Sequence, residues 1–370
     1  MYRSWVEVDL TGLRGNLSAI RRALPRSTEL VLVVKADAYG HGIPAIARSA
    51  VAEGVRWFGV VHMDEAEAVR EASADTRIVM LGPPPPEAAG WLLERNIIPV
   101  LVSLDHARAL SAEAARRGGK ISAHVKLDTG MGRLGLDASA AAAALREMLV
   151  LPGIRVDGLC THFARVDLDG EDPAAEQVAR FREIARDAEA AAGRSLFKHV
   201  SSSRAALYRP AWDFDGVRPG LIAYGYGASN EDGRIRTRPV LQWKARVVQV
   251  RSVPANFAVG YYGTYRTPAP TTLAVVGLGY ADGYLRALSN RGHILIGGRR
   301  CRVVGRVSMN WITVDAGLYG RVKEGDEAVV MGRQGNQELW ADELATLCRT
   351  IPYEILTSIS AATERRYVGS

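Results

Sequence analysis

The most reactive candidate in the sequence is Lys35, which directly follows an apolar run. The surrounding segment reads Val33-Val-Lys-Ala-Asp-Ala-Tyr-Gly-His-Gly42. A hydrophobic environment lowers the pKa of a lysine and favours the free amine, the form that can bond to a carbonyl carbon. A lysine at the end of a strand is otherwise more often a surface residue whose stem packs on apolar neighbours. The segment therefore predicts covalent amine chemistry but, taken alone, leaves the surface alternative open.

Other reactive side chains occupy the same kind of position, the end of a predicted strand. They are His62, Ser103, Lys126, Asp128, His162, Ser203 and Arg218. Eight apolar runs alternate with amphipathic stretches, and they begin at Val31, Trp57, Arg77, Ile98, Ile121, Arg155, Phe197 and Phe214. Eight strands separated by helices predict an α/β fold of the (β/α)8 TIM-barrel type, whose active sites lie at the carboxyl ends of the strands.

The pattern changes near Arg238, where apolar residues begin to recur with a period of two. We therefore expect a barrel over residues 1–237, followed by a mostly β domain over residues 238–370 that ends with two helices. Ahead of the barrel strands, Trp5 to Leu10 is expected to form a strand, followed by a helix capped by Thr11. A dinucleotide-binding sheet is disfavoured because the sequence lacks an early glycine fingerprint.

Composition indicates an ordinary globular protein. The 370 residues are 48% hydrophobic and 24% charged, and no run of roughly 18 apolar residues predicts a membrane span, so we expect a cytoplasmic protein. The three cysteines lie far apart, which favours buried thiols over disulfides or a metal site. The net charge of +7 is spread along the chain and indicates a solvated surface, with no nucleic-acid partner.

The segment around Lys35 resembles the cofactor-lysine motif of the alanine racemases, pyridoxal-phosphate enzymes built from a barrel and a β domain. Similar blocks follow in order along essentially the whole chain. They are Lys126-Leu-Asp-Thr-Gly-Met-Gly-Arg-Leu-Gly135, Thr161-His-Phe-Ala164, Val217-Arg-Pro-Gly220, Val259-Gly-Tyr261, Gly279-Tyr-Ala-Asp-Gly-Tyr284, Gly305-Arg-Val-Ser-Met309 and Ile351-Pro-Tyr-Glu354. Individually, His162, Arg218 and Tyr261 could be core or packing residues, but their joint occurrence favours an active site.

The resemblance implies a set of roles. Lys35 would hold pyridoxal 5'-phosphate as a Schiff base and act as the base on the D-alanine face, and Tyr261 of a neighbouring subunit would act on the L-alanine face. Arg218 would meet the ring nitrogen, with His162 behind the ring, and Lys126, often carbamylated in the family, would hold Arg133. Barrels commonly bind phosphate after strands seven and eight, which nominates Ser203, Gly220 and Leu221, and resemblance adds Tyr39 and Tyr353. The substrate carboxylate would meet Arg133 and the Met309 amide, and Tyr280 belongs to an entrance motif.

These roles imply an isomerase that interconverts L- and D-alanine by a two-base mechanism, as a homodimer with shared active sites, for D-alanine biosynthesis and peptidoglycan supply. Broader alanine and serine racemisation is an alternative. A decarboxylase of the same architecture is a weaker one, because such enzymes typically place an acidic residue at the ring nitrogen. The chain departs from the family pattern at Asn310, where aspartate is common, which puts rate and substrate preference in doubt.

Overall fold

A computed structural model describes residues 4–166, 173–227, 234–317 and 322–369 of the chain. The described residues divide into two compact units. The barrel unit consists of residues 14–38 and 43–237, and the β-rich unit consists of residues 4–13, 39–42 and 238–369, within those described ranges.

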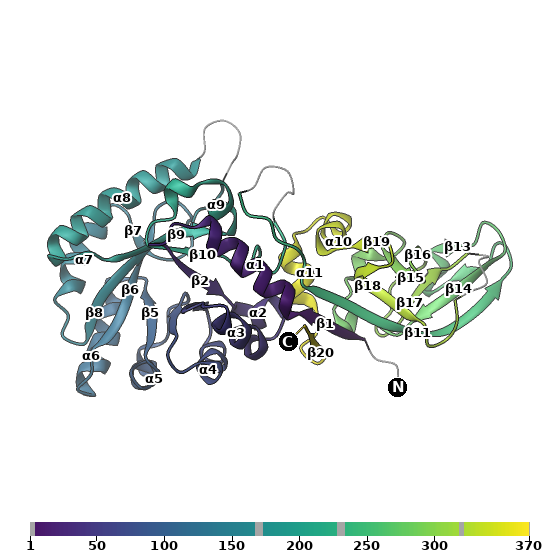
Figure 1. Ribbon diagram of the computed structural model, residues 1–370, viewed down its shortest axis with the longest axis horizontal. Helices are drawn as coiled ribbons and strands as arrows, with labels where there is room; N and C mark the ends of the chain where they lie inside the picture. Colours follow the sequence, from purple (N-terminus) through teal and green to yellow (C-terminus); the bar gives the residue numbers. More distant parts are fainter. Residues whose placement is uncertain (1–3, 167–172, 228–233, 318–321, 370) are drawn as a thin grey trace. The chain divides into compact units, whose positions relative to one another are not determined.

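The barrel unit contains a closed ring of eight parallel strands (Figure 1). The ring runs β2-β3-β4-β5-β6-β8-β9-β10 and closes because β10 pairs with β2. The strands are β2 (Glu29–Val33), β3 (Trp57–Val60), β4 (Arg77–Met80), β5 (Ile97–Leu101), β6 (Ile121–Asp128), β8 (Ile154–Cys160), β9 (Phe197–Ser202) and β10 (Gly216–Arg218). Each predicted barrel strand coincides with one of these, so the TIM-barrel prediction is confirmed.

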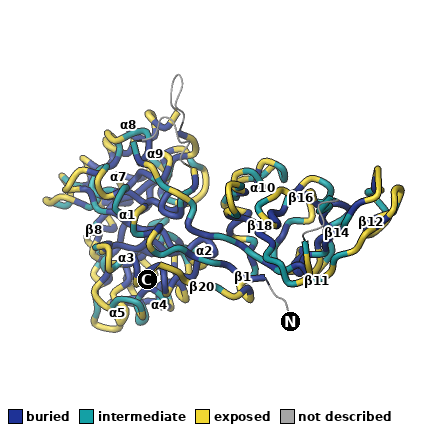
Figure 2. Tube along the Cα trace, turned by 45° about the vertical axis from the view of Figure 1, so that its right-hand side comes forward, coloured by how far each residue is buried: buried dark blue, intermediate teal, exposed yellow. Residues whose placement is uncertain are grey.

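Burial explains why these runs form barrel strands. Parallel strands covered on both faces need continuous apolar sequence, and β2, β3 and β5 are buried almost throughout. The helices between strands bury one face and expose the other (Figure 2). They are α1 (Leu10–Ala23), α2 (Lys35–Gly40), α3 (Ile43–Ala52), α4 (Met63–Ala72), α5 (Ala89–Arg95), α6 (Leu104–Arg116), α7 (Ala141–Leu149), α8 (Pro173–Ala192) and α9 (Ser203–Tyr208).

The β-rich unit is built on one mixed sheet in the order β19-β18-β15-β16-β17-β14-β11-β1-β20, with β18 also paired to β11. Its strands are β1 (Trp5–Asp9), β11 (Leu241–Val253), β14 (Thr271–Val276), β15 (His293–Ile296), β16 (Arg299–Val303), β17 (Ile312–Asp315), β18 (Glu327–Gln334), β19 (Gln337–Leu339) and β20 (Glu364–Val368). The hairpin β12 (Ala258–Val259) and β13 (Tyr265–Arg266), and helices α10 (Ala341–Cys348) and α11 (Pro352–Ser358), complete it.

The first strand belongs to this second unit, whereas the expected division placed residues 1–237 together. β1 pairs antiparallel with β11 and parallel with β20, so its backbone groups are satisfied by the end of the chain. The expected cap of α1 is also wrong. The helix begins at Leu10, and the Asp9 carboxylate accepts the Gly12 N–H at 2.8 Å, while the Thr11 hydroxyl donates to the Gly369 carbonyl.

Among the helices of the described residues, none is both long and apolar enough to span a membrane.

Candidate active site

Lys35 lies directly beyond the carboxyl end of β2, where α2 begins, and its side chain is half-buried. Burial is the main cause that lowers the pKa of Lys35, and the positive charges of Arg133 and Arg218 lower it further, while Glu65 opposes the shift. The lowered pKa makes the neutral amine, the form that can bond to a carbonyl carbon, more accessible near neutrality.

The turn that follows Lys35 is left-handed. Ala36, Asp37, Ala38 and Tyr39 have φ values of 52° to 55°, a region that costs roughly 1–2 kcal/mol for each residue carrying a Cβ atom. Side chains hold this strained segment in place: the Glu65 carboxylate accepts the Ala36 N–H at 2.6 Å, and Asp37 accepts the Ile43 N–H at 3.0 Å. Strained backbone held by its surroundings is characteristic of functional sites.

Arg218 ends β10, the strand next to β2 in the barrel, and its guanidinium is buried. One terminal nitrogen donates to His199 Nδ1 at 2.9 Å and to the His199 carbonyl, and the other donates to the carbonyls of Thr161 and Val200. No hydrogen bond within the described ranges uses the Arg218 Nε–H, and this nitrogen is not fully enclosed by protein. The barrel therefore fixes Arg218 and leaves one donor for a ligand.

His162 follows β8 and contacts the same guanidinium, with 3.3 Å between Arg218 Nη2 and His162 Nδ1. Arginine can only donate, so this long contact favours the neutral tautomer in which His162 Nδ1 accepts and Nε2 carries the proton. Burial lowers the pKa of His162 to about 3, and the neighbouring positive charges contribute, so the ring is neutral at physiological pH. Gln177 of α8 donates to the His162 carbonyl and thereby holds this segment.

Lys126, near the end of β6, is buried, and no hydrogen bond or ion pair of its ammonium group is found in the part of the chain that the structure describes. Burial lowers the pKa of Lys126, Cys160 opposes the shift, and the charges of Arg218 and Arg133 lower it further. Burial beside other cations destabilises the ammonium ion and shifts the protonation equilibrium of Lys126 toward the neutral amine.

The loop that carries Arg133 is shaped by Asp128 at the end of β6. The Asp128 carboxylate accepts the backbone N–H groups of Gly130, Met131, Gly132 and Arg133 at 2.8–3.1 Å. Burial raises the pKa of Asp128, but the four backbone donors outweigh burial and hold the pKa below its ordinary value. At the end of the loop a Cβ atom on Gly135 would lie 2.8 Å from the Lys126 carbonyl oxygen, so only glycine allows this close approach.

Replacing Asp128 with asparagine is expected to raise KM for the substrate roughly tenfold with a smaller change in kcat, because an amide cannot accept all four N–H groups and Arg133, the residue expected to bind substrate, loses its position. Steady-state kinetics of Asp128→Asn checks this. Asp137→Asn is the matched control, since Asp137 is exposed and its carboxylate accepts only from Ser139 among the described residues. An unchanged KM in Asp128→Asn would show that the loop does not position a substrate-binding group.

The groups expected to bind phosphate meet at the ends of β9 and β10. Ser203 is buried, and its Oγ accepts the N–H of Gly220 at 3.0 Å and that of Ile222 at 3.4 Å. The Leu221 N–H makes no hydrogen bond among the described residues. The Ser203 hydroxyl, the Gly220 N–H bound to it and the unpaired Leu221 N–H thus lie together at adjacent strand ends, an arrangement that suits an anion.

The remaining predicted residues, Tyr39, Tyr261, Tyr280, Met309 and Tyr353, belong to the β-rich unit. The rings of Tyr39 and Tyr353 lie 5.8 Å apart, and burial raises the pKa of Tyr353. The Tyr280 N–H donates to the Ser308 carbonyl and the Ala281 N–H donates to the Met309 carbonyl, both at 3.0 Å. The entrance motif and the Met309 block therefore pack together.

Glycine is essential to that contact, since a Cβ atom on Gly279 would lie 2.4 Å from the Met309 carbonyl oxygen. The Met309 N–H itself has no hydrogen-bond partner within the described ranges. Tyr261 is 65% exposed, so its hydroxyl group is not committed to the core of its own unit.

The barrel unit thus brings together most of the predicted site at one end: Lys35, Lys126, Arg133, His162, Ser203, Arg218, Gly220 and Leu221. Sequence reasoning missed the residues that support them, namely Glu65, Gln177 and His199, and it gave Asp128 no more than a place at a strand end. Glu65 also accepts the Val61 and His62 N–H groups directly after β3.

Two known family models cover nearly the whole chain. "Alanine racemase, N-terminal domain" matches residues 8–228, and "Alanine racemase, C-terminal domain" matches residues 240–367.

Individual proteins are similar over full length. An alanine racemase of Syntrophobacter fumaroxidans is 42% identical, covering 97% of this chain and 96% of the relative. The structure of alanine racemase from Streptomyces coelicolor A3(2) is 35% identical with a TM-score of 0.92, over 100% of this chain and 98% of that one. The Bartonella henselae alanine racemase with covalently bound pyridoxal phosphate is 27% identical with a TM-score of 0.88, over 99% of both chains. The chain therefore belongs to the alanine racemase family.

Proposed function

We propose that this chain interconverts L-alanine and D-alanine with pyridoxal phosphate bound covalently at Lys35, and that Lys35 and Tyr261 are its two bases. The observation that carries the proposal is the pairing of a lysine of lowered pKa with a buried arginine, Arg218, at the ends of the neighbouring strands β2 and β10. The neighbour from Bartonella henselae, which holds this cofactor covalently, supports it.

The residues present fit this cofactor. Arg218 has one uncommitted donor, the Nε–H, for the ring nitrogen, and Ser203 with the N–H groups of Gly220 and Leu221 would hold the phosphate together with Tyr39 and Tyr353. Pyridoxal phosphate supplies an electron sink that makes the α-proton of alanine acidic. Because arginine stays charged and only donates, Arg218 would leave the ring nitrogen unprotonated, which would moderate that sink and suit reversible proton transfer.

Each base serves one face of the substrate. The Lys35 amine would move the α-proton on the D-alanine face, and the Tyr261 hydroxyl would do so on the L-alanine face. A free tyrosine titrates near pH 10, so Tyr261 must be tuned to act near neutrality. We assign this tuning to the His162 Nε2–H, which the contact with Arg218 leaves free to donate to a phenolate oxygen.

Replacing His162 with alanine is expected to move the ascending limb of the pH-rate profile for L-alanine to higher pH, because Tyr261 must be a phenolate to remove the α-proton and would lose a donor that stabilises this form. Since the pKa of His162 is about 3, the wild-type profile should carry no limb from His162 itself above pH 5. The measurement is kcat/KM for L-alanine between pH 6 and pH 11, with His106→Ala as a control outside the site. An unchanged profile for His162→Ala would refute the coupling.

Substrate recognition would rest on the α-carboxylate and on limited space. Arg133 and the Met309 N–H would bind the carboxylate, and Tyr261 and Tyr353 would crowd out large side chains. Tyr280 would line the entrance. Asn310, next to Met309, could widen the range to serine, and comparing kcat/KM for the two amino acids separates an alanine racemase from a broader alanine and serine racemase.

Lys126 would be carbamylated. Its neutral amine would bond to the carbon of carbon dioxide and lose a proton, which produces an anion next to Arg133 and replaces repulsion with attraction. A carbamate carbon signal in the NMR spectrum of protein equilibrated with labelled bicarbonate, absent from Lys126→Ala, tests this assignment.

The active site would be shared between the subunits of a homodimer, with residues 238–370 completing the partner's site. The β-rich unit carries unusually exposed large apolar side chains: Tyr261, Tyr262, Met309, Trp311 and Ile351, which are 50–90% exposed. Large apolar side chains exposed to this extent are typical of a surface that another subunit covers. The expected location is the cytoplasm, and the expected role is the supply of D-alanine for peptidoglycan.

Incubating the holoenzyme with L-alanine and following D-alanine formation tests the reaction itself. A decarboxylase of the same architecture would release carbon dioxide without forming D-alanine.

A further inference from the structure

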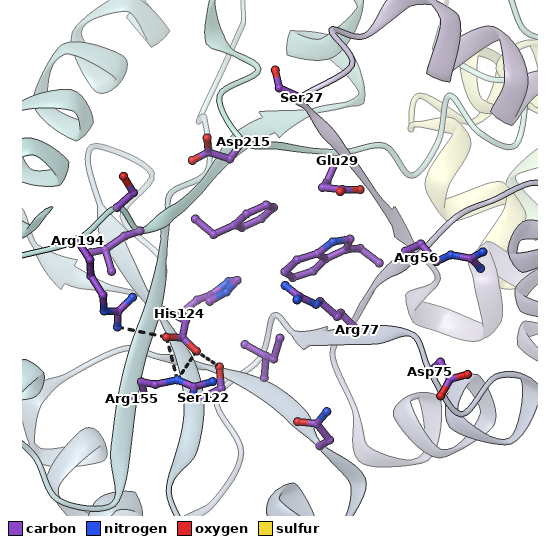
Figure 3. Close-up of a pocket in the computed structure, with 17 residues that line it drawn as sticks. Ser27, Glu29, Arg56, Asp75, Arg77, Ser122, His124, Arg155, Arg194 and Asp215 are labelled. Carbon is purple, nitrogen blue, oxygen red and sulfur yellow. Dashed lines mark hydrogen bonds and ion pairs between the residues drawn. The ribbon is translucent and has the colours of Figure 1, made fainter. Parts of the chain in front are cut away.

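A second cavity lies at the opposite end of the barrel, where the strands begin (Figure 3). It has a volume of about 920 Å³, and its walls include the first residues of several barrel strands, among them Glu29 of β2, Trp57 of β3, Arg77 of β4 and Phe197 of β9. Lys35 and Arg218 lie at the other ends of their strands, so this cavity is separate from the candidate active site.

A chain of hydrogen bonds crosses the barrel between the two ends. Arg218 Nη1 lies 2.9 Å from His199 Nδ1, and His199 Nε2 lies 2.9 Å from His124 Nδ1. Both imidazoles are buried, and burial is the main cause that lowers the pKa of His124 to about 4 and that of His199 well below its ordinary value. Each ring is therefore neutral and carries a single proton.

The donors and acceptors in this chain can have only one direction. Arginine cannot accept a hydrogen bond, so His199 accepts at Nδ1 and must carry its proton on Nε2. That proton is donated to His124 Nδ1, which leaves His124 protonated on Nε2. The guanidinium at one end of the barrel thus dictates that an imidazole N–H is presented at the other end.

The His124 Nε2–H has no acceptor among the described residues, although the His124 side chain is only 1% exposed. The Nε2 atom is not fully enclosed by protein, and His124 lines the cavity. An N–H of a buried side chain that finds no partner in the protein and borders an open cavity is a donor awaiting an acceptor from outside.

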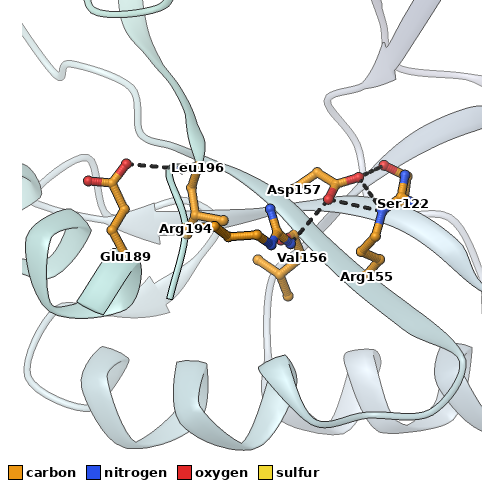
Figure 4. A network of polar contacts seen from close by, with 7 residues as sticks. All are labelled: Ser122, Arg155, Val156, Asp157, Glu189, Arg194 and Leu196. Carbon is orange, nitrogen blue, oxygen red and sulfur yellow. Dashed lines mark hydrogen bonds and ion pairs between the residues drawn. The ribbon is translucent and has the colours of Figure 1, made fainter. Parts of the chain in front are cut away.

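The nearest charged groups show which acceptor fits. The Asp157 carboxylate is already saturated by the Ser122 hydroxyl, Arg155 Nε at 2.8 Å and Arg194 Nη2 at 3.2 Å (Figure 4). Arg77, in contrast, makes no ion pair or hydrogen bond within the described part of the chain, and its guanidinium lies 4.9 Å from the Trp57 ring.

Other charged residues line the cavity as well. Asp215 is paired with Lys198 at 3.2 Å, and Glu29, Arg56 and Asp75 also line it. Figure 3 shows the His124 imidazole and the Arg77 guanidinium turned toward the middle of the cavity. His124 and Arg77 thus offer a ligand one neutral donor and one cation.

The apolar part of the wall favours a flat ligand body. Trp57 and Phe197 are stacked, with 4.5 Å between ring centroids and 8° between ring planes, and His124 lies 5.7 Å from the Phe197 ring. Trp57 belongs to a buried apolar cluster with Val31, Val79 and Ile98, and Phe197 packs against this cluster. Ring edges next to a donor and a cation suit an unsaturated body that ends in a carboxylate.

We propose that this cavity binds a small planar organic carboxylate, which accepts the His124 Nε2–H, pairs with Arg77 and acts on Arg218 through His199. An acceptor at His124 Nε2 makes His124 Nδ1 a stronger acceptor, and this strengthens each following hydrogen bond up to the guanidinium. Binding itself is independent of the proposed function, whereas the effect on catalysis rests on the proposed contact of Arg218 with the cofactor.

The test uses radiolabelled benzoate and equilibrium dialysis of the holoenzyme in saturating alanine, which occupies the active site. We expect one saturable benzoate per chain, at least tenfold weaker binding in Arg77→Gln and in His124→Phe, and at least tenfold weaker binding of the neutral analogue benzamide. Arg108→Gln is the matched control, because Arg108 is an exposed arginine of the same unit that pairs with Glu147. This variant should bind benzoate with the affinity of wild type. If His124→Phe fails to fold, the benzoate affinity of Arg77→Gln still tests the site.

Absence of saturable binding in the millimolar range, displacement of benzoate by alanine, or equal affinity in Arg77→Gln would each overturn the site. A second readout is the visible absorbance of the bound cofactor, which benzoate should shift in wild type but not in Arg77→Gln at the same concentration. Benzoate binding without this shift would retain the site and reject its coupling to Arg218.

Discussion

Lys35→Ala is expected to lose racemase activity by at least about 10⁴-fold, the upper range for removal of a single acid–base group, because the substitution removes both the cofactor anchor and the base of the D-alanine face. The visible absorbance of the covalently bound cofactor should vanish together with activity. Borohydride reduction followed by peptide mapping checks this, since wild type should be labelled at Lys35 and the variant should carry no label.

Two further variants separate chemistry from folding. Lys35→Arg keeps a long cationic side chain but cannot form the covalent link, so it should be as inactive as Lys35→Ala while retaining the thermal stability of wild type. Lys120→Ala removes an exposed lysine of the same barrel unit and should leave activity and labelling intact. Racemisation by Lys35→Ala near the wild-type rate would show that another group performs the chemistry.

Tyr261→Phe is expected to lower racemisation in both directions by roughly 10²–10⁴-fold, the usual contribution of a single acid–base group. Both directions must fall by the same factor in kcat/KM, because the equilibrium constant between enantiomers is fixed. Exchange of the α-proton with solvent separates the two bases. In deuterated water, Tyr261→Phe should still introduce deuterium into D-alanine through Lys35, but it should exchange L-alanine hardly at all.

The neighbouring Tyr262 provides the control, because it is 90% exposed and has no assigned proton-transfer role. Tyr262→Phe should exchange both enantiomers at nearly wild-type rates. Rapid exchange of L-alanine by Tyr261→Phe would mean that the base on that face is a different residue.

The barrel could be predicted from sequence because its strands are buried on both faces and therefore read as continuous apolar runs. The strands that pair with the first strand could not be predicted in this way. Trp5 to Asp9 is a short apolar segment, and its pairing with β11 and β20 depends on residues more than two hundred positions away. The same limit affected the start of α1, where Asp9 and Thr11 are both plausible caps and only the geometry selects Asp9.

The site shows a similar division. Strand ends and family motifs indicated Lys35, His162 and Arg218, because the topology of a barrel gathers strand ends without further information. The left-handed turn from Ala36 to Tyr39 had no such signal, since glycine normally marks positive φ and none of these four residues is glycine.

The supporting residues were hidden for another reason. His124 and His199 come from strands β6 and β9, which are not neighbours in sequence, and Glu65 lies on the ordinary amphipathic helix α4. Each acts through a contact that exists only once the barrel has closed. A pattern in one sequence predicts where a side chain lies along a strand, but it does not predict which buried side chain it meets across the ring.

The central claim, that Lys35 of one subunit and Tyr261 of the other form a single catalytic pair, is tested most directly by mixing Lys35→Ala with Tyr261→Phe. After verified subunit exchange, each heterodimer should contain one site with both bases intact and one site with neither. At equal proportions half of the dimers are mixed, so about one quarter of wild-type activity should appear from two inactive proteins. No recovery of activity after complete exchange would contradict a shared site.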